Sequence, residues 1–324
     1  MNNKIAIMIP DHNDPFLIQT IKSAIYNAKN PELLYFSVFS TNNKIDEKEL
    51  NDIPNLNINI IKAESKAPIG VGISRLVAAS SRVHKCDYHL QVDAHTIFSK
   101  NWDEILLNYY EVISKKHGDD IVISASTEEW FISDDNLITL YFPHDTVVDP
   151  YNFEMPDIKN GGRIKLFATT FPNTKNKRVQ ASSDGHYHWK DKDYIEQYAL
   201  IGHFIFTKDK FFTEFIQDPL MIWYGDQEIM ALRAWTRGWR FFAISKVPVF
   251  TQRKTEEDIK KHPRDHRHES HKIGKERVRT NERYMKILNG DILGYWGAKD
   301  MDSLRLWEEK NEVKFIGYLS EENE

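Results

Sequence analysis

Short apolar runs recur along the first part of the chain, and segments with a different spacing of apolar residues separate them. Residues 4–10 read KIAIMIP, a run typical of a buried strand. Comparable runs occupy residues 34–40, 58–61, 88–92 and 121–126. From Leu17 onward, apolar residues recur every three or four positions, as in an amphipathic helix. Alternating strands and helices predict an α/β sheet with both faces covered.

Turn and cap residues mark where the predicted helices begin. Asp14 followed by Pro15 predicts a helix N-cap and a first helical residue. A second predicted helix follows Gly70 and Gly72 and carries Arg75. The residues that we predict on its buried side are Ile73, Leu76 and Val77.

The helix and strand periodicity of the apolar residues is lost after about residue 126 and returns at about residue 200. We predict an irregular binding loop at about residues 127–200, since long structureless inserts in compact enzymes usually serve binding. Further strands are predicted at residues 200–207, 239–244 and 247–250. The chain therefore divides into one domain at residues 1–252 and a charged, histidine-rich C-terminal extension at residues 253–324.

Composition narrows the class of protein only a little. With 324 residues and 41% hydrophobic content, the chain can bury a large core, and we expect no membrane span. A single cysteine, Cys86, excludes an intramolecular disulfide and predicts a cytoplasmic location. The net charge of −5 indicates no partner, although residues 253–283 hold 11 Lys/Arg against 7 Asp/Glu.

Polar residues follow two of the predicted strands, at the edge where ligands of α/β sheets gather. Asp11 and His12 follow the first strand, and Asp93-Ala94-His95 follows the strand at residues 88–92. A carboxylate and an imidazole two positions apart suit a divalent cation such as Mn²⁺, which can hold a diphosphate. The alternative interpretation of this D-x-H triplet is a turn aspartate followed by a surface histidine, with no bound metal.

Arg75 and an acidic pair have both a functional and a structural interpretation. Arg75 suits a phosphate or a nucleobase carbonyl, but it also fits a solvated helix face. Asp226 is predicted to cap a helix that runs to Arg237, with Glu228 in its first turn. Carboxylates beside aromatic residues suit sugar hydroxyls, and they also suit a helix N-terminus. The histidine run that begins at His262 indicates either a metal ligand or a charged tail.

Three stretches in this order resemble the cytoplasmic hydroxyproline-polypeptide N-acetylglucosaminyltransferase family, which has the GT-A fold, and more weakly the polypeptide N-acetylgalactosaminyltransferases. The stretches are IAIMIPDHNDPFLIQTIKSAIYNAKNPE, then APIGVGISRLVAAS with LQVDAHTIFSKNWDE, and finally GHFIFTKDKFFTEFIQDPLMIWYGDQEIMALRAWTRGWRFFA. The resemblance implies a nucleotide-diphospho-sugar transferase fold with a mixed, mainly parallel sheet flanked by helices. It implies a metal-dependent, retaining glycosyltransferase that uses a UDP-sugar.

The resemblance also implies roles for individual residues. Asp93 and His95 match a D-x-H site for Mn²⁺ or Mg²⁺, and Asp226 and Glu228 match the catalytic acidic pair. The residues implied to bind the nucleotide sugar are Pro10, Asp11, His12, Arg75 and Asp93. Relatives carry a third metal ligand, a histidine, where this chain reads Val249–Gln252. His262 is therefore the candidate for that ligand.

Several acceptors stay open at this point. The resemblance implies a hydroxyproline-bearing protein, with the irregular insert on the acceptor side. The basic segment at residues 253–283 suits phosphates, and hence a hydroxymethylated base in phage DNA. Bacterial surface polysaccharide is a third possibility. The alternative to an enzyme is a non-catalytic protein of the same fold that binds sugar nucleotides or nucleic acid.

Overall fold

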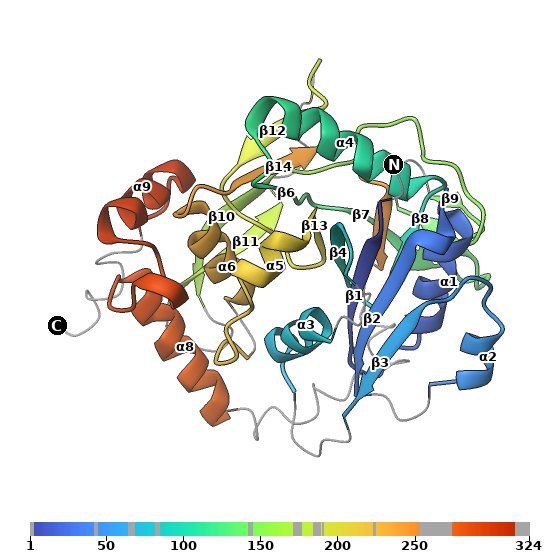
Figure 1. Ribbon diagram of the computed structural model, residues 1–324, viewed down its shortest axis with the longest axis horizontal. Helices are drawn as coiled ribbons and strands as arrows, with labels where there is room; N and C mark the ends of the chain where they lie inside the picture. Colours follow the sequence, from blue (N-terminus) through green and yellow to red (C-terminus); the bar gives the residue numbers. More distant parts are fainter. Residues whose placement is uncertain are drawn as a thin grey trace.

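An eight-stranded mixed sheet forms the centre of the protein (Figure 1). The computed structural model describes residues 3–41, 45–63, 69–81, 85–141, 145–170, 177–183, 189, 191–222, 225–252 and 274–314. The strand order across the sheet is β12 (Tyr194–Gln197), β14 (Arg240–Ile244), β6 (Ile121–Ile123), β13 (Phe204–Lys208), β4 (Tyr88–Val92), β1 (Ile5–Asp11), β2 (Leu34–Ser40) and β3 (Ile58–Lys62). Strands β4, β1, β2 and β3 are parallel, whereas β13 is antiparallel to both of its neighbours.

Two smaller sheets complete the β-structure. The first has five strands in the order β5 (Thr96–Phe98), β15 (Val249–Gln252), β7 (Glu128–Ile132), β8 (Ile138–Leu140) and β9 (Thr146–Val147). The second is the antiparallel pair β10 (Ile164–Thr170) and β11 (Lys177–Ser183). The prediction of an irregular insert at residues 127–200 is therefore wrong, because strands β7 to β12 fall in it. Several of these strands are short and carry exposed apolar residues, so their sequence lacks a clear alternation.

Helices cover both faces of the large sheet, as the sequence predicts (Figure 1). The helical elements are α1 (Leu17–Asn27), η1 (Pro31–Leu33), α2 (Glu47–Asn51), α3 (Val71–Ser80), α4 (Trp102–His117), α5 (Asp209–Glu214), α6 (Asp226–Trp235), α8 (Gly274–Leu288), η3 (Gly294–Trp296) and α9 (Met301–Asn311). Within the part of the chain that the structure describes, no helix has both the length and the apolar character to span a bilayer.

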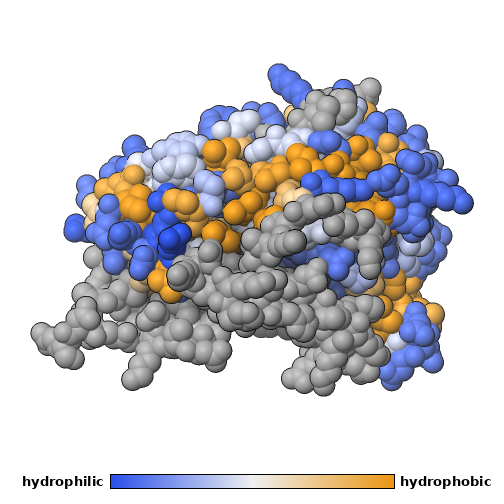
Figure 2. Space-filling model, turned by 90° about the horizontal axis from the view of Figure 1, so that it is seen from below, coloured by the Kyte–Doolittle hydropathy of each residue, from blue (hydrophilic) through white to orange (hydrophobic). Residues whose placement is uncertain are grey.

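Strand β1 shows why the central runs are apolar at every position. Ile5, Ile7 and Ile9 face a core cluster with α1 and α4, whereas Met8 faces a second cluster with α3, α5 and α6. Side chains that alternate along a strand thus meet a helix layer on either face. Seen from below the view of Figure 1, hydrophobic residues lie across the middle of the molecule with hydrophilic residues at both margins (Figure 2).

Helix α3 turns a different face to the core from the one predicted. Its buried residues are Gly72, Ser74, Arg75, Ala78 and Ala79, while the three larger apolar residues stay partly exposed. The small residues let the helix approach its neighbours closely. A Cβ on Gly72 would stand 1.9 Å from the carbonyl oxygen of Met221. A Cβ on Gly70 would stand equally close, 1.9 Å, to the carbonyl oxygen of Ile222, so both glycines make room for backbone packing.

The described part of the predicted C-terminal extension packs onto the same core as the rest of the chain. Tyr284 of α8 and Trp307 of α9 belong to the cluster that also holds the buried residues of α6. The indole N–H of Trp307 donates a hydrogen bond to the carbonyl of Tyr198 at 2.9 Å. Helices α8 and α9 therefore pack into the same core as α6 and the large sheet.

Trp307→Ala is expected to lower the free energy of unfolding by about 3–5 kcal/mol, because it removes a large buried ring and leaves a cavity. The neighbouring Leu306 is the matched control, since it is 45% exposed whereas Trp307 is fully buried. Urea unfolding of both variants measures the difference. Equal, small effects would show that α9 is not part of the cooperative core.

Candidate active site

The turn between β4 and β5 is fixed through its backbone before any ligand binds. Trp130 Nε1 donates to the carbonyl of His95 at 3.1 Å, and the backbone N–H of Gln252 donates to the same carbonyl at 3.0 Å. Thr20 Oγ1 donates to the Ala94 carbonyl and accepts from the Thr96 N–H, each at 2.9 Å. The turn is therefore held by the Thr20 and Trp130 side chains together with the backbone of Gln252.

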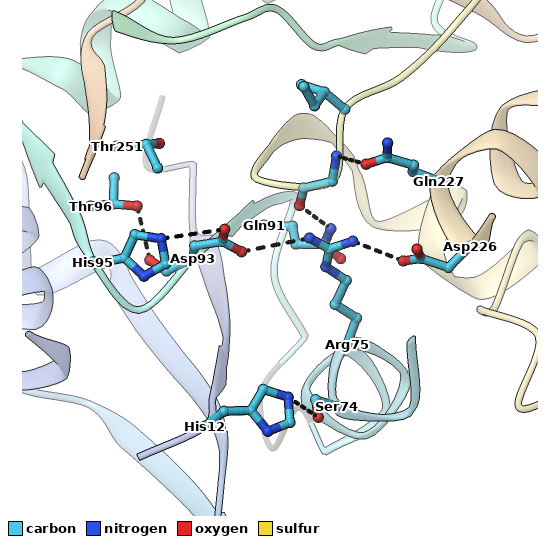
Figure 3. A network of polar contacts seen from close by, with 12 residues as sticks. His12, Ser74, Arg75, Gln91, Asp93, His95, Thr96, Asp226, Gln227 and Thr251 are labelled. Carbon is cyan, nitrogen blue, oxygen red and sulfur yellow. Dashed lines mark hydrogen bonds and ion pairs between the residues drawn. The ribbon is translucent and has the colours of Figure 1, made fainter. Parts of the chain in front are cut away.

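Asp93 and His95 lie side by side on this turn, as the sequence predicts (Figure 3). His95 Nε2 is 3.6 Å from Asp93 Oδ2. The Asp93 side chain is 25% exposed, whereas His95 is almost completely buried. The carboxylate can thus meet a ligand from solvent while the imidazole lies behind it.

Arg75 joins this turn to helix α6. Its Nη1 is 2.8 Å from Asp226 Oδ2, and its Nη2 is 3.6 Å from Asp93 Oδ1 (Figure 3). Burial alone lowers the pKa of Arg75, but the two carboxylates outweigh that effect and leave its pKa above the ordinary value. Since Arg75 is only 7% exposed, the alternative of a solvated helix-face arginine is wrong.

Gly202 provides the space that the Arg75 guanidinium occupies. A Cβ at this position would stand 2.1 Å from Arg75 Nη1. Gln91 Nε2 donates to the Gly202 carbonyl at 2.6 Å, and the Gly202 N–H donates to Gln227 Oε1 at 2.7 Å (Figure 3). Sequence reasoning missed these three residues, although Gly202 stands in the GHF stretch that carries the family resemblance.

The loop after β1 also meets helix α3. His12 Nε2 lies 2.9 Å from Ser74 Oγ (Figure 3). Because Ser74 directly precedes Arg75 in the sequence, this contact brings His12 close to the Arg75 network. Asp11 is fully buried, accepts the Asp14 N–H at 2.8 Å and receives a hydrogen bond from Ser40. Pro10 is buried within β1. His12 is therefore the member of this group with a partly exposed side chain beside the Arg75 network.

Asp14 has a different role from the predicted N-cap, because helix α1 begins only at Leu17 and has no side-chain cap. Its Oδ1 accepts the Phe16 N–H at 3.1 Å, and its Oδ2 lies 2.9 Å from His95 Nδ1. The cap prediction failed because an aspartate before a proline looks the same in sequence whether it caps a helix or reaches a distant side chain.

Helix α6 begins at Asp226, so this residue is the first helical residue and Gly225 is the N-cap, contrary to the prediction. The helix ends at Trp235, two residues before the predicted Arg237. Gly225 has a φ of +81°, a conformation that favours glycine. The left-handed Gly225 directly precedes Asp226, whose carboxylate accepts the hydrogen bond from Arg75.

Glu228 is connected to this network through the side chain of Gln227, which also accepts the Gly202 N–H. It is 3% exposed, and its Oε1 accepts the Ala181 N–H of β11 at 2.7 Å and a hydrogen bond from Gln227 at 3.1 Å. Burial, the largest cause, raises the pKa of Glu228 to about 7. The two acids thus have different direct partners: Asp226 pairs with Arg75, whereas Glu228 accepts hydrogen bonds from Ala181 and Gln227.

The side chains present fit a hard divalent cation that completes its shell with ligand oxygens. Asp93 supplies carboxylate oxygen and His95 supplies imidazole nitrogen, both of which Mn²⁺ accepts. Among the described residues, no group of three or more His, Cys, Asp or Glu side chains could hold a metal ion. Cations of this type often take one or two protein ligands and substrate phosphates. His262 lies outside the described residues, and its role as the third metal ligand stays a prediction.

The mixed sheet with helices on both faces matches the GT-A fold of a solved glycosyltransferase. The crystal structure of GalNAc-T7 with UDP, GalNAc and Mn²⁺ is similar, with a TM-score of 0.54 and 15% identity over 99% of this chain. The match covers 56% of the GalNAc-T7 chain, so this chain spans little more than half of that length. The structure of S. aureus TarS 1–349 with UDP-GlcNAc matches at a TM-score of 0.46 and 13% identity, over 89% of this chain and 68% of that one.

The family model described as Glycosyltransferase (GlcNAc) matches residues 46–300, which is most of the chain. The chain belongs to this glycosyltransferase family. The expected glycosyltransferase family and GT-A fold are therefore confirmed, while metal dependence, the retaining mechanism and the narrower hydroxyproline-polypeptide family stay predictions. No curated protein matches the chain.

Glu228→Gln is expected to change how stability depends on pH. Between the ordinary pKa of 4.5 and the raised value of about 7, folded Glu228 keeps a proton that the unfolded chain releases. The stabilising contribution is thus present below pH 4.5 and is lost by pH 7. Relative to Glu228→Gln, the wild type should lose about 3 kcal/mol over this range. Urea unfolding at several pH values measures it, and parallel stability profiles would contradict the assignment.

Proposed function

We propose that this chain transfers a sugar from a UDP-sugar to a hydroxyl group of a macromolecular acceptor, with the help of a divalent cation. The observation that carries the proposal is the position of Asp93, between His95 on one side and Arg75 on the other, at 3.6 Å from each. A carboxylate at a strand end, with an imidazole and a guanidinium beside it, suits a cation-bound diphosphate. GalNAc-T7, which shares the fold, was crystallised with UDP, GalNAc and Mn²⁺.

Asp93 and His95 would hold the cation, Mn²⁺ or Mg²⁺. When bound there, such a cation offsets the negative charge that builds up on the leaving diphosphate. The backbone hydrogen bonds of the Asp93–His95 turn keep both side chains in place, so little reorganisation is needed when the donor binds. This preorganisation supports a catalytic role for the turn rather than a solely structural one.

Arg75 would position the donor side of the site and balance the charges of Asp93 and Asp226. His12 would contact the nucleotide from the loop after β1, with Pro10 and the buried Asp11 shaping that loop. The hydrogen bond between His12 and Ser74 supports this placement, because it brings the loop to helix α3. The nucleotide would then lie at the carboxyl ends of β1 and β4, where ligands of α/β sheets bind.

Asp226 is the stronger candidate of the two acids for contact with the reacting sugar, because Arg75 ties it to the Asp93 turn. Glu228 would support α6 through its bond to β11, and its raised pKa also allows it to carry a proton near neutral pH. The family resemblance implies that the transferred sugar keeps its anomeric configuration, and we include this retaining mechanism in the proposal. A protein that only binds the sugar nucleotide would keep the donor affinity and release no UDP.

Asp93→Asn is expected to lower the release of UDP from UDP-GlcNAc on the order of 100-fold, because it removes a charge from the site of the diphosphate. The assay uses protein with Mn²⁺ and no acceptor, so that slow hydrolysis reports on the donor site. Asp87→Asn is the matched control: Asp87 precedes the same strand, β4, at its other end and accepts the N–H of Lys4. Undiminished UDP release by Asp93→Asn would contradict the proposal.

The salt dependence of binding distinguishes a DNA acceptor from a neutral peptide acceptor. A duplex containing hydroxymethylated cytosine should lose affinity on the order of 100-fold or more between low and moderate salt, because binding releases counterions. A neutral hydroxyproline peptide should bind with little salt dependence. Fluorescence anisotropy with both probes measures this, and salt-insensitive duplex binding would remove DNA from the proposal.

A further inference from the structure

The His95 imidazole is held from the side opposite Asp93. Its Nδ1 lies 2.9 Å from Asp14 Oδ2, and its Nε2 lies 3.6 Å from Asp93 Oδ2. An ionised carboxylate accepts hydrogen bonds only. When Nδ1 carries the proton, its N–H donates a hydrogen bond to Asp14, and the Nε2 lone pair is directed towards Asp93.

Asp14 is itself fixed on the chain. It is buried, its Oδ1 accepts the Phe16 N–H at 3.1 Å, and its own N–H donates to Asp11 Oδ1 at 2.8 Å. Asp11 is fully buried at the end of β1. The loop that follows β1 therefore sets the position of the carboxylate that faces His95, over a sequence distance of 81 residues.

We propose that Asp14 is a positioning residue that sets the tautomer and orientation of His95, so that Nε2 can serve as the cation ligand beside Asp93. The inference rests on the proposed function, since it adds an outer partner to the proposed metal ligands. Histidines that bind metals commonly donate their other ring N–H to a carboxylate, which fixes the ring and its tautomer. Sequence reasoning gave Asp14 only a capping role.

Asp14→Asn tests the proposal with little change of shape. The asparagine oxygen can still accept the Phe16 N–H, but its NH₂ group then faces His95 Nδ1 as a donor. The proton of His95 must then move to Nε2, which removes the lone pair from the metal side. We expect the affinity for Mn²⁺, titrated with UDP present and followed by electron paramagnetic resonance, to fall about 10- to 100-fold.

The metal-free protein gives a second readout. ¹⁵N NMR of labelled histidines, with His95→Gln for assignment, should show protonation at Nδ1 of His95 in the wild type and at Nε2 in Asp14→Asn. Asp103→Asn is the control, because Asp103 is also buried and accepts two backbone N–H groups, those of Lys29 and Asn30. It should change neither the Mn²⁺ affinity nor the His95 tautomer.

Two results would overturn the role of Asp14: a wild-type His95 that carries no proton on Nδ1, or an Asp14→Asn variant with wild-type Mn²⁺ affinity. Asp93→Asn separates this failure from failure of the proposed function. If Asp93→Asn loses Mn²⁺ and Asp14→Asn does not, only the positioning role fails. If the wild type binds no Mn²⁺ with UDP, or Asp93→Asn binds it normally, the proposed metal site and the role of Asp14 both fail.

Discussion

The ion pairs of Arg75 are the interaction on which the rest of the site depends. The guanidinium is buried between Asp226 of α6 and Asp93 at the end of β4. Removing one partner of a buried pair typically costs about 3–5 kcal/mol, because the remaining charge is left without compensation. The carboxyl end of β4 and helix α6 are thus held together by charged side chains that neither element could bury alone.

Close backbone packing makes this arrangement possible. Gly202 leaves room for the Arg75 guanidinium, and Gly72 lets α3 lie against the segment that precedes α6. From the other side, the Tyr284 ring of α8 packs against Gly225, and its hydroxyl donates to the Val179 carbonyl of β11 at 2.7 Å. The C-terminal helices therefore help to place Asp226, although they are distant in sequence from the Asp93–His95 turn.

Local patterns predicted the central strands and the Asp93–His95 pair, because continuous apolar runs and polar strand ends are visible in sequence. They did not predict the burial of Arg75, since the helix packs through small residues that apolar periodicity does not register. Nor could they predict the contact between Asp14 and His95, because a local cap and a long-range hydrogen bond use the same residue type. The short strands between residues 127 and 200 depend on partners elsewhere in the chain.

The central claim is that the Asp93 turn and Arg75 form a donor site that needs a cation. Isothermal titration of UDP-GlcNAc into the wild-type protein, with Mn²⁺ and then with a chelator, tests it most directly. We expect saturable binding of UDP-GlcNAc with Mn²⁺ and a large loss of affinity when the metal is removed. Equal affinity under both conditions, or no binding under either, would contradict it.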